Sequence, residues 1–504
     1  MGFARLYTRS TKGMLAPEVI VEVHVANGLP SFAIVGLPDT EVKESRDRVR
    51  SAIQMSGFEF PARRITVNLA PADLPKDSSR FDLPIALGVL LASGLIKPHL
   101  EMGNFEFAGE LALDGGLRAI KGALAIAYNA RESSRGFILP QSNADEASLV
   151  DGVTVYAAGS LSQVVLHITG ENLILPVMDA GIRACNPKTT INELNLNQVR
   201  GQMSAKTALE IAASGRHSLL MVGNPGCGKS MLAQRIVTIL PLLNDREAIT
   251  TASIYSVSNS GFNLDLWGKA PFRQPHHSSS SAAIVGGGHY PMPGEISLAH
   301  NGVLFLDEIA EFERSVIEVL REPLETKQIS LSRARYKVEF PADFQLIAAM
   351  NPCPCGNRGH PQKVCVCSPS QVSRYCTKLS APFLDRIDLV VEVPYLKADE
   401  LAYLPMGEDS AVVRKRVFEV RDIQLQRQNK LNYALNNQEI LEYAVLTESA
   451  RTLLTQLSEK MALSARAYYK ILKVARTIAD LGQQKAIETV HIAQSMQYSQ
   501  RNFS

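Results

Sequence analysis

Eight consecutive residues match the pattern Gly-x-x-x-x-Gly-Lys-Ser, which is typical of a loop that binds nucleotide phosphates. The apolar residues 218–222 before it predict a buried strand, and the residues after it predict a helix. Glycines let backbone N–H groups surround phosphate oxygens at the positive end of that helix. Lys229 is expected to reach the β- and γ-phosphates, and Ser230 to bind Mg²⁺. The predicted nucleotide-binding residues are Gly223, Asn224, Pro225, Gly226, Cys227, Gly228, Lys229, Ser230 and Met231.

Two later apolar segments carry the remaining groups that ATP hydrolysis needs. Residues 302–306 predict a buried strand that ends at Asp307 and Glu308. Asp307 is expected to hold Mg²⁺ through water, and Glu308 to orient and deprotonate the attacking water. Residues 344–350 predict another strand, after which the Asn351 side chain is positioned to sense the γ-phosphate. A chance glycine-rich turn is the alternative, and the strand, helix and acidic strand together disfavour it.

Two Cys-x-Cys pairs follow, separated by nine residues: Cys353, Cys355, Cys365 and Cys367. Four thiolates arranged in two pairs can form a tetrahedral zinc site. The usual pair has two intervening residues, so this spacing is a good match but not an ideal one. His360 and Cys376 are substitute ligands, and free buried thiols or a redox pair are the alternatives.

The composition is that of an ordinary globular chain. Its 504 residues are 46% hydrophobic and 20% charged, so two to four domains are expected. A formal net charge of +2 requires any nucleic-acid site to be a local patch. The first residues lack an apolar core of signal-peptide length, and residues 83–96 are short for a membrane span. No membrane partner is therefore expected. Four of the seven cysteines form two tight pairs, which in a nucleotide-binding chain favours a reducing cytoplasm over disulfides.

The predicted elements divide the chain into four regions. Residues 1–165 are expected to form an α/β domain, with strands at 18–25, 31–35 and 65–68 and helices at 41–55 and from residue 83. A polar, turn-rich linker at 166–195 follows. The ATPase core is expected at 196–395, and a lid of amphipathic helices with C-terminal helices at 396–504.

The segment from Leu74 to Ala86 resembles the active-site region of the Lon protease domain, within the ribosomal protein S5 domain 2-like fold. That resemblance implies a Lon protease-like N-terminal domain. Lon-type proteases have a serine three residues after the aspartate, and here that position is Arg80. Ser78 and Ser79 are out of register, and a serine nucleophile needs a base within hydrogen-bond reach. We therefore expect a protease-like fold without protease activity.

Residues 293–308 resemble the AAA+ branch that contains magnesium-chelatase motor subunits and the replicative MCM helicases. With the N-terminal domain, the chain is similar over nearly its full length to the ComM/YifB family of Mg-chelatase-like AAA+ ATPases. The resemblance implies an AAA+ P-loop ATPase fold with an α-helical lid, which uses ATP and Mg²⁺. It also implies a homo-hexameric, ATP-driven branch-migration helicase that supports DNA integration in natural transformation, with DNA and recombination proteins as partners.

Two arginines are assigned through the same resemblance. Arg386, within residues 384–388, matches an arginine finger that reaches the γ-phosphate bound by the neighbouring subunit. The alternative for Arg386 is a salt bridge to Asp385 or Asp388. Arg466 matches the sensor-2 arginine of AAA+ lids, on a helix capped by Ser464, and a solvated helix charge is its alternative.

Two insertions carry the predicted DNA contacts. The first contains three glycines followed by His289 and Tyr290, side chains that can stack on bases or wedge between them. The second, residues 327–340, alternates like a hairpin. Arg333, Arg335 and Lys337 would neutralise phosphates, and Tyr336 lies among them as a further DNA-contact candidate. The family resemblance implies that such a hairpin points into a central channel, and an exposed hairpin with ordinary lysines is the alternative.

Two other functions remain open. A magnesium-chelatase-like motor would remodel a protein client and would hydrolyse ATP regardless of DNA. An ATP-dependent protease would lose its activity when Ser78 or Ser79 is replaced by alanine. The N-terminal domain and the basic hairpin argue against the first function, and Arg80 argues against the second.

Overall fold

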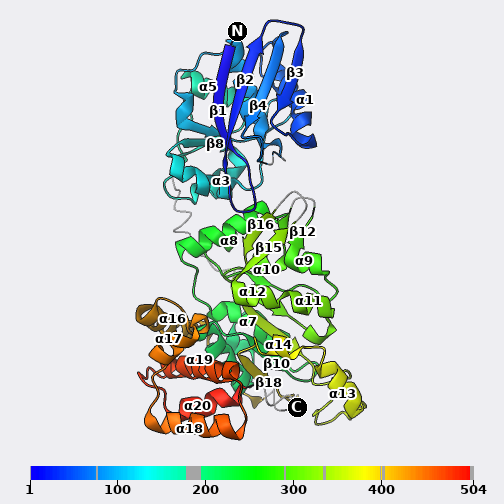
Figure 1. The fold of residues 1–504 in the computed structure, drawn as a ribbon, viewed down its shortest axis with the longest axis vertical. Helices are drawn as coiled ribbons and strands as arrows, with labels where there is room; N and C mark the ends of the chain where they lie inside the picture. Colours follow the sequence, from blue (N-terminus) through cyan, green and yellow to red (C-terminus); the bar gives the residue numbers. More distant parts are fainter. Residues whose placement is uncertain are drawn as a thin grey trace. The chain divides into compact units, whose positions relative to one another are not determined.

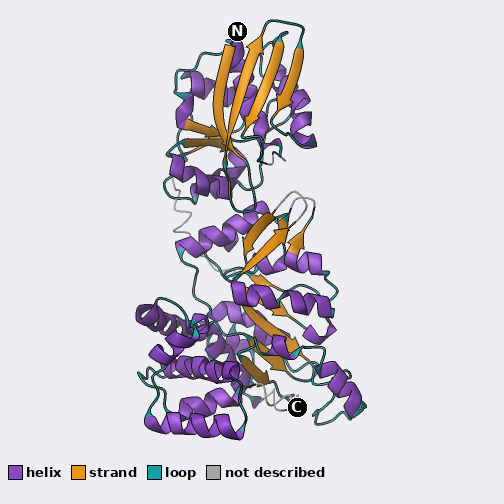
Figure 2. Cartoon of the chain, in the orientation of Figure 1, coloured by secondary structure: helices purple, strands orange, loops and turns teal. Residues whose placement is uncertain are grey.

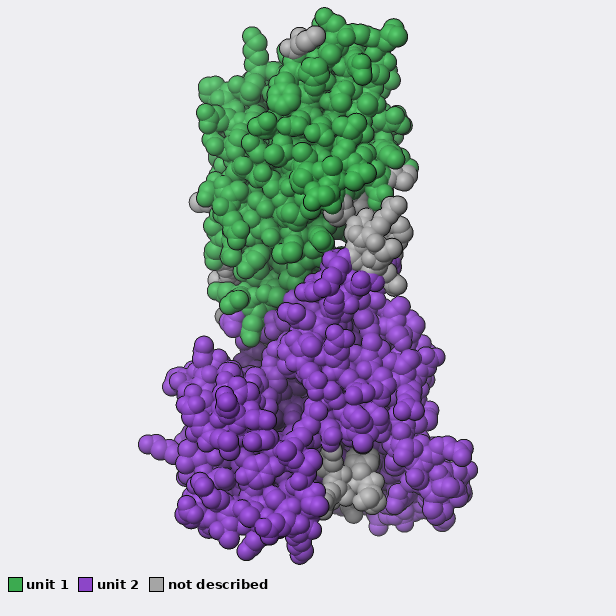
Figure 3. Space-filling view, in the orientation of Figure 1, with its two compact units in different colours: residues 1–188, 245–267 green, residues 189–244, 268–504 purple. Residues whose placement is uncertain are grey.

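The computed structural model describes residues 2–74, 76, 78–177, 194–288, 291–332, 337–397, 399 and 403–499. The chain divides into two compact units, which Figure 3 shows in different colours. Unit 1 contains residues 1–188 and 245–267, and unit 2 contains residues 189–244 and 268–504. Of the helices that the structure describes, none combines the length and the apolar character needed to cross a membrane.

Unit 1 is built on a seven-stranded mixed sheet in the order β3-β4-β2-β1-β5-β8-β9 (Figure 1). Its strands are β1 (Gly2–Arg9), β2 (Glu18–Ala26), β3 (Ser31–Val35), β4 (Arg64–Ala70), β5 (Phe105–Phe107), β8 (Gly136–Pro140) and β9 (Val155–Ala158). A two-stranded hairpin joins β6 (Glu110–Leu111) to β7 (Leu117–Arg118). Strand β1 lies at the centre of the sheet, although the sequence did not single it out.

The helices of unit 1 are α1 (Thr40–Met55), α2 (Asp82–Ser93), α3 (Ala123–Ala130), α4 (Ala144–Ser148), α5 (Leu161–Thr169) and α8 (Asp245–Val257). Side chains of α1, α2 and α5 share one core with β1, β2 and β4. The apolar run from residue 83 is therefore a buried helix, as its length predicts. Helix α5 runs past the predicted domain boundary at residue 165.

Helix α8 comes from the insertion between the phosphate-binding loop and the acidic strand. Residues 245–267 fall within the predicted ATPase core, but the structure includes them in unit 1. Ala252 and Ile249 join the core around α3, and the Gly122 N–H donates to the Ser256 carbonyl at 3.0 Å. Burial of this apolar face explains why the helix departs from the predicted boundary.

Unit 2 contains a five-stranded parallel sheet in the order β11-β14-β17-β10-β18 (Figure 2). Its strands are β10 (Leu219–Val222), β11 (Phe272–Arg273), β14 (Val303–Leu306), β17 (Gln345–Met350) and β18 (Leu389–Glu392). Alternate residues of β14 point to opposite faces of the sheet. Phe305 joins the hydrophobic core on one face, and Leu304 and Leu306 join the core on the other face. Both faces are covered, so strands β10 and β14 are apolar throughout.

Helices α6 (Met203–Gly215), α7 (Lys229–Ile239), α16 (Ser410–Gln428) and α19 (Ala465–Leu481) contribute to the first of these cores. Short helices cover the other face: α9 (Ser281–Val285), α10 (Glu295–Leu298), α11 (Arg314–Val319), α13 (Pro369–Cys376) and α14 (Ala381–Leu384). Helix α12 (Arg321–Thr326) leads into the hairpin of β15 (Gln328–Ser332) and β16 (Lys337–Pro341). A smaller hairpin pairs β12 (Gly286–Gly287) with β13 (Met292–Pro293).

The predicted C-terminal helices are present. Helices α17 (Asn437–Tyr443), α18 (Glu448–Lys460), α19 and α20 (Thr489–Gln497) share a separate core. Ser464 caps α19 by accepting a hydrogen bond from the Ala467 N–H at 3.2 Å, as predicted. The helix ends at Leu481, and Gly482 is its C-cap residue.

Candidate nucleotide-binding site

The loop after β10 curves around the Lys229 ammonium group. Lys229 Nζ donates to the carbonyls of Gly223 and Asn224 at 2.6 and 3.0 Å and to Asn351 Oδ1 at 3.1 Å. Helix α7 begins at Lys229 because Gly228 has a φ of 94°, a conformation that glycine adopts without a Cβ clash. Burial lowers the pKa of the Lys229 ammonium below its usual range. The structure thus brings the predicted lysine and the predicted sensor asparagine together at the carboxyl edge of the sheet, where parallel α/β sheets bind ligands.

The two side chains predicted to bind magnesium are in contact. Ser230 Oγ, on α7, donates to Asp307 Oδ2 at 2.6 Å, although the two residues are 77 positions apart in the sequence. Asp307 follows β14, so strand pairing brings its carboxylate to the start of α7. A hydroxyl and a carboxylate are hard oxygen ligands of the kind that Mg²⁺ prefers, so this pair fits the ion.

Glu308 points away from the core beside the same edge. Its backbone has a φ of 50°, and 51% of its side chain is exposed. His277 Nδ1 lies 4.0 Å from Glu308 Oε2. The sequence analysis did not assign a role to His277. This residue lies shortly after β11, and a strand of two residues is recognisable only from its pairing with β14.

Arg386 and Arg466 lie at the opposite, amino edge of the sheet. Their guanidinium groups converge on Glu325 Oε1, at 2.7 Å from Arg386 Nη2 and 3.1 Å from Arg466 Nη2. The alternative pairing of Arg386 with Asp385 or Asp388 is not what forms: Asp388 accepts hydrogen bonds from the backbone N–H and hydroxyl of Ser218.

A cavity of about 490 Å³ lies at this amino edge, and both arginines line it with Lys470, Lys473 and Ser218. Ser218 directly precedes β10, and Gly223 directly follows it. At roughly 3.3 Å per residue, the strand separates the cavity from the phosphate-binding loop by about 16 Å. That separation far exceeds a hydrogen bond of about 3 Å, so the arginines and the loop face different sites.

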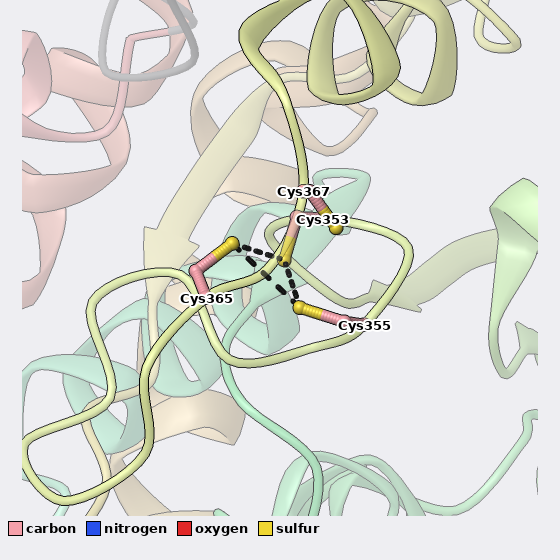
Figure 4. Close-up of side chains that lie close together, drawn as sticks. All are labelled: Cys353, Cys355, Cys365 and Cys367. Carbon is pink, nitrogen blue, oxygen red and sulfur yellow. Dashed lines mark hydrogen bonds between the residues drawn. The ribbon is translucent and has the colours of Figure 1, made fainter.

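The four cysteines of the two Cys-x-Cys pairs point toward one another in the loop after β17 (Figure 4). Cys353 Sγ lies 3.4 Å from Cys355 Sγ and 3.6 Å from Cys365 Sγ, and Cys355 Sγ lies 3.6 Å from Cys365 Sγ. All four sulfur atoms, Cys367 included, lie within 4.8 Å of one another. Backbone N–H groups of Asn357 and Val366 lower the pKa of the Cys355 thiol to about 6.

This cluster fits a tetrahedral zinc ion. A Zn–S bond of about 2.3 Å sets sulfur atoms about 3.8 Å apart at the corners of a tetrahedron. The substitute ligands have other surroundings. His360 Nδ1 accepts the backbone N–H groups of Gln362 and Lys363 at 3.0 Å each, and its ring contacts Tyr395. Cys376 belongs to α13 and is not part of the cluster.

Most of the predicted DNA contacts fall outside the described residues: His289, Tyr290, Arg333, Arg335 and Tyr336. The hairpin that would carry the second set is present, with Ser332 opposite Lys337. Lys337 is 68% exposed, and its Nζ lies 3.3 Å from Glu339 Oε1. A surface pair of this kind is weak and leaves the lysine accessible.

The serines considered as nucleophiles in unit 1 have other partners. Ser79 Oγ donates to the Glu110 carboxylate, and Ser78 Oγ accepts from the Arg80 N–H at 3.3 Å. Lys76 is buried, and its ammonium donates to the Pro71 carbonyl. Among the described residues, these hydrogen bonds join neither serine to a lysine.

Comparison with known families gives matches along most of the chain. The family described as magnesium chelatase, subunit ChlI, matches residues 195–401. A second, described as subunit ChlI of Mg-chelatase, matches residues 21–143. A third, the ChlI C-terminal family, matches residues 407–499.

Two relatives match over nearly their full length. Competence protein ComM of Haemophilus influenzae is 48% identical over 501 residues, which cover 99% of this chain and 97% of the relative. The protein YifB of Escherichia coli (strain K12) is 46% identical over 502 residues, which also cover 99% of this chain and 97% of the relative. The chain therefore belongs to the ComM/YifB family of magnesium-chelatase-like ATPases.

Proposed function

We propose that the chain hydrolyses ATP with Mg²⁺ at the carboxyl edge of the unit 2 sheet. Contact of Lys229 with Asn351 and of Ser230 with Asp307 is the observation that carries the proposal. Lys229 holds the β- and γ-phosphates, Asn351 senses the γ-phosphate, and Ser230 and Asp307 hold the metal ion. Glu308 accepts the proton of the attacking water. Bound Mg²⁺ neutralises the charge that develops on the phosphate oxygens.

We further propose that the site is completed by a neighbouring copy of the chain in a homo-hexameric ring. Arg386 and Arg466 lie together beside Ser218 at the amino edge, and about 16 Å of strand separates Ser218 from the phosphate-binding loop of the same chain. Two arginines supplied across a subunit interface would stabilise the transition state and make hydrolysis depend on assembly. Arg386 acts as the finger, and Arg466 acts as the lid arginine of the same interface.

We propose DNA as the substrate on which this motor acts. The relative named competence protein ComM supports a role in competence. Within that role we propose the integration of DNA during natural transformation, by a branch-migration helicase that works with recombination proteins. The hairpin of β15 and β16 carries an exposed Lys337, and the neighbouring Arg333, Arg335 and Tyr336 supply further cations and a stacking group. His289 and Tyr290 would add base contacts from the shorter insertion.

Two accessory features complete the proposal. The N-terminal region is taken to have a Lon protease-like fold without protease activity, on the strength of the sequence around Arg80. The cluster of Cys353, Cys355, Cys365 and Cys367 is taken to bind a structural Zn²⁺, on the strength of its sulfur spacing.

The first experiment measures ATP hydrolysis with no DNA, with single-stranded DNA and with forked DNA, on the unmodified chain and on Glu308→Gln. Stimulation by DNA that disappears in Glu308→Gln supports the DNA motor. Hydrolysis that Glu308→Gln abolishes but that no DNA stimulates would instead favour a motor for a protein client. The magnesium-chelatase descriptions of the matching families keep that second function under test.

A further inference from the structure

The phosphate-binding loop and the cysteine loop contact each other through a buried side chain. Asn224 is 6% exposed, and its Nδ2 donates to the carbonyls of Gly356 and Arg358 at 2.6 and 3.1 Å. Both acceptors lie between the two halves of the cysteine cluster, just after Cys355. A side chain of the nucleotide site therefore has its amide fixed by the backbone of the cysteine loop.

The two loops also pack closely against each other at Gly356 and Pro225. Gly356 has a φ of 74°, and a Cβ added there would lie 2.6 Å from the ring of Pro225. Only glycine permits this approach without a shift of one of the two loops. Asn224 and Pro225, two neighbouring residues of the phosphate-binding loop, thus both depend on the position of Gly356.

The cysteines shape the segment that Asn224 contacts. The Gly356 N–H donates to the Cys353 carbonyl at 3.0 Å, and the Arg358 N–H donates to Cys353 Sγ at 3.4 Å. Cys353 is fully buried, and it follows Asn351 by two residues. Because Asn351 Oδ1 accepts from Lys229 Nζ, the loop meets the nucleotide site at a second point.

We propose that metal binding at the four cysteines and nucleotide binding at the phosphate-binding loop are thermodynamically linked through Asn224. A metal ion joining Cys353 and Cys355 to Cys365 and Cys367 fixes the Gly356 and Arg358 carbonyls, and these fix the Asn224 side chain. Release of the metal frees the loop, so the nucleotide site becomes less ordered and binds more weakly. The inference rests on the proposed nucleotide and zinc sites.

The test measures the affinity for a fluorescent ADP analogue in zinc-loaded protein and in protein stripped with a chelator. Couplings between sites commonly amount to about 5- to 150-fold, and we expect a loss of about 10-fold on stripping. By reciprocity, ADP should tighten zinc binding by the same factor, measured with a chromogenic zinc indicator. Circular dichroism checks whether the stripped protein is folded. If it is not, the zinc titration with and without ADP is compared between the unmodified chain and Asn224→Ala, because folding alone would link the two ligands.

Variants locate the path of the linkage. Cys365→Ser should reproduce the loss of affinity, whereas Cys376→Ser, a cysteine outside the cluster, should not. In Asn224→Ala the ratio of loaded to stripped affinities should fall most of the way to 1, whatever the variant does to affinity itself, because only the contacts of Pro225 and Asn351 remain. A ratio that persists in Asn224→Ala contradicts this path.

Each failure has its own meaning. Equal ADP affinity of fully loaded and fully stripped protein overturns the inference and leaves the nucleotide site intact. No zinc bound at any concentration overturns both the inference and the zinc site. No ADP bound by either form contradicts the proposed ATPase itself.

Discussion

The two edges of the unit 2 sheet differ in what one chain supplies. At the carboxyl edge, four side chains from three separate segments are already in hydrogen-bond contact: Lys229 with Asn351, and Ser230 with Asp307. At the amino edge, Arg386 and Arg466 share Glu325 beside a cavity of about 490 Å³. The first edge has the groups proposed to bind phosphate and metal, and the second has the cations proposed to stabilise a transition state.

This difference indicates that the two halves of the proposed site serve different nucleotides. The strand β10 puts about 16 Å between Ser218, which lines the cavity with Arg386, and Gly223, where the loop of Lys229 begins. A head-to-tail ring brings the amino edge of one copy to the carboxyl edge of the next. The comparison therefore predicts that defects at the two edges complement each other.

Arg386→Ala should have the largest effect. Removal of an arginine finger lowers hydrolysis by about 1,000-fold or more, and binding of ADP should remain nearly unchanged because the finger acts on a neighbour's nucleotide. Steady-state ATP hydrolysis and ADP titration measure the two effects. A parallel loss of ADP affinity would mean that Arg386 serves the site of its own chain.

Lys229→Met should weaken nucleotide binding by about 10- to 100-fold, since it removes a charged hydrogen-bond donor from the phosphates. Mixing this variant with Arg386→Ala sharpens the comparison. In a random ring about one quarter of the interfaces combine an intact loop with an intact finger, so hydrolysis should partly return. No recovery on mixing, with rings formed, would contradict the shared site.

The residues of the carboxyl edge could be predicted because each is tied to a local pattern. An apolar strand followed by Asp307 and Glu308, or by Asn351, fixes where the side chain emerges, and the sheet then brings these strand ends together. The hairpin of β15 and β16 was predicted from alternation, and the capped helix α19 from Ser464.

The residues of the amino edge depend on contacts that no local pattern contains. Glu325 lies in a short helix that also contains Glu322, and only the tertiary structure brings it to Arg386 and Arg466. Helix α8 was assigned to the wrong unit for the same reason, because its apolar face fits a core from distant sequence. Asn224 was predicted as part of a motif, but its contact with Gly356 was not.

Glu325→Gln tests whether the shared carboxylate restrains the two arginines. Glu325 competes with the phosphate of a neighbouring nucleotide, so removal of its charge should raise hydrolysis at low ATP by about 2- to 5-fold, the scale of one partly exposed ion pair. Glu322→Gln, an exposed glutamate of the same helix, is the matched control. A decrease in hydrolysis would instead make Glu325 a support that positions the arginines.

The smallest expected effect concerns His300, and it changes the stability of the fold rather than the rate of ATP hydrolysis. It lies at the amino edge, where its Nδ1 accepts the Asp343 N–H at 3.0 Å, and burial lowers the pKa of its imidazole from 6.5 to about 4. The folded protein therefore binds this proton less readily than the unfolded chain does. The stability contributed by neutral His300 is complete above pH 6.5 and is lost as the pH falls toward 4, by up to about 1.4 kcal/mol per pH unit.

His300→Gln keeps an acceptor for the Asp343 N–H but removes the titration. Urea unfolding at several pH values between about 4 and 7 should show a shallower loss of stability in the variant, by up to one proton. The nucleotide site at the carboxyl edge serves as the control. Above pH 6.5, the unmodified chain and His300→Gln should bind ADP with the same affinity. An unchanged pH slope would mean that His300 is not the group that makes the amino edge sensitive to acid.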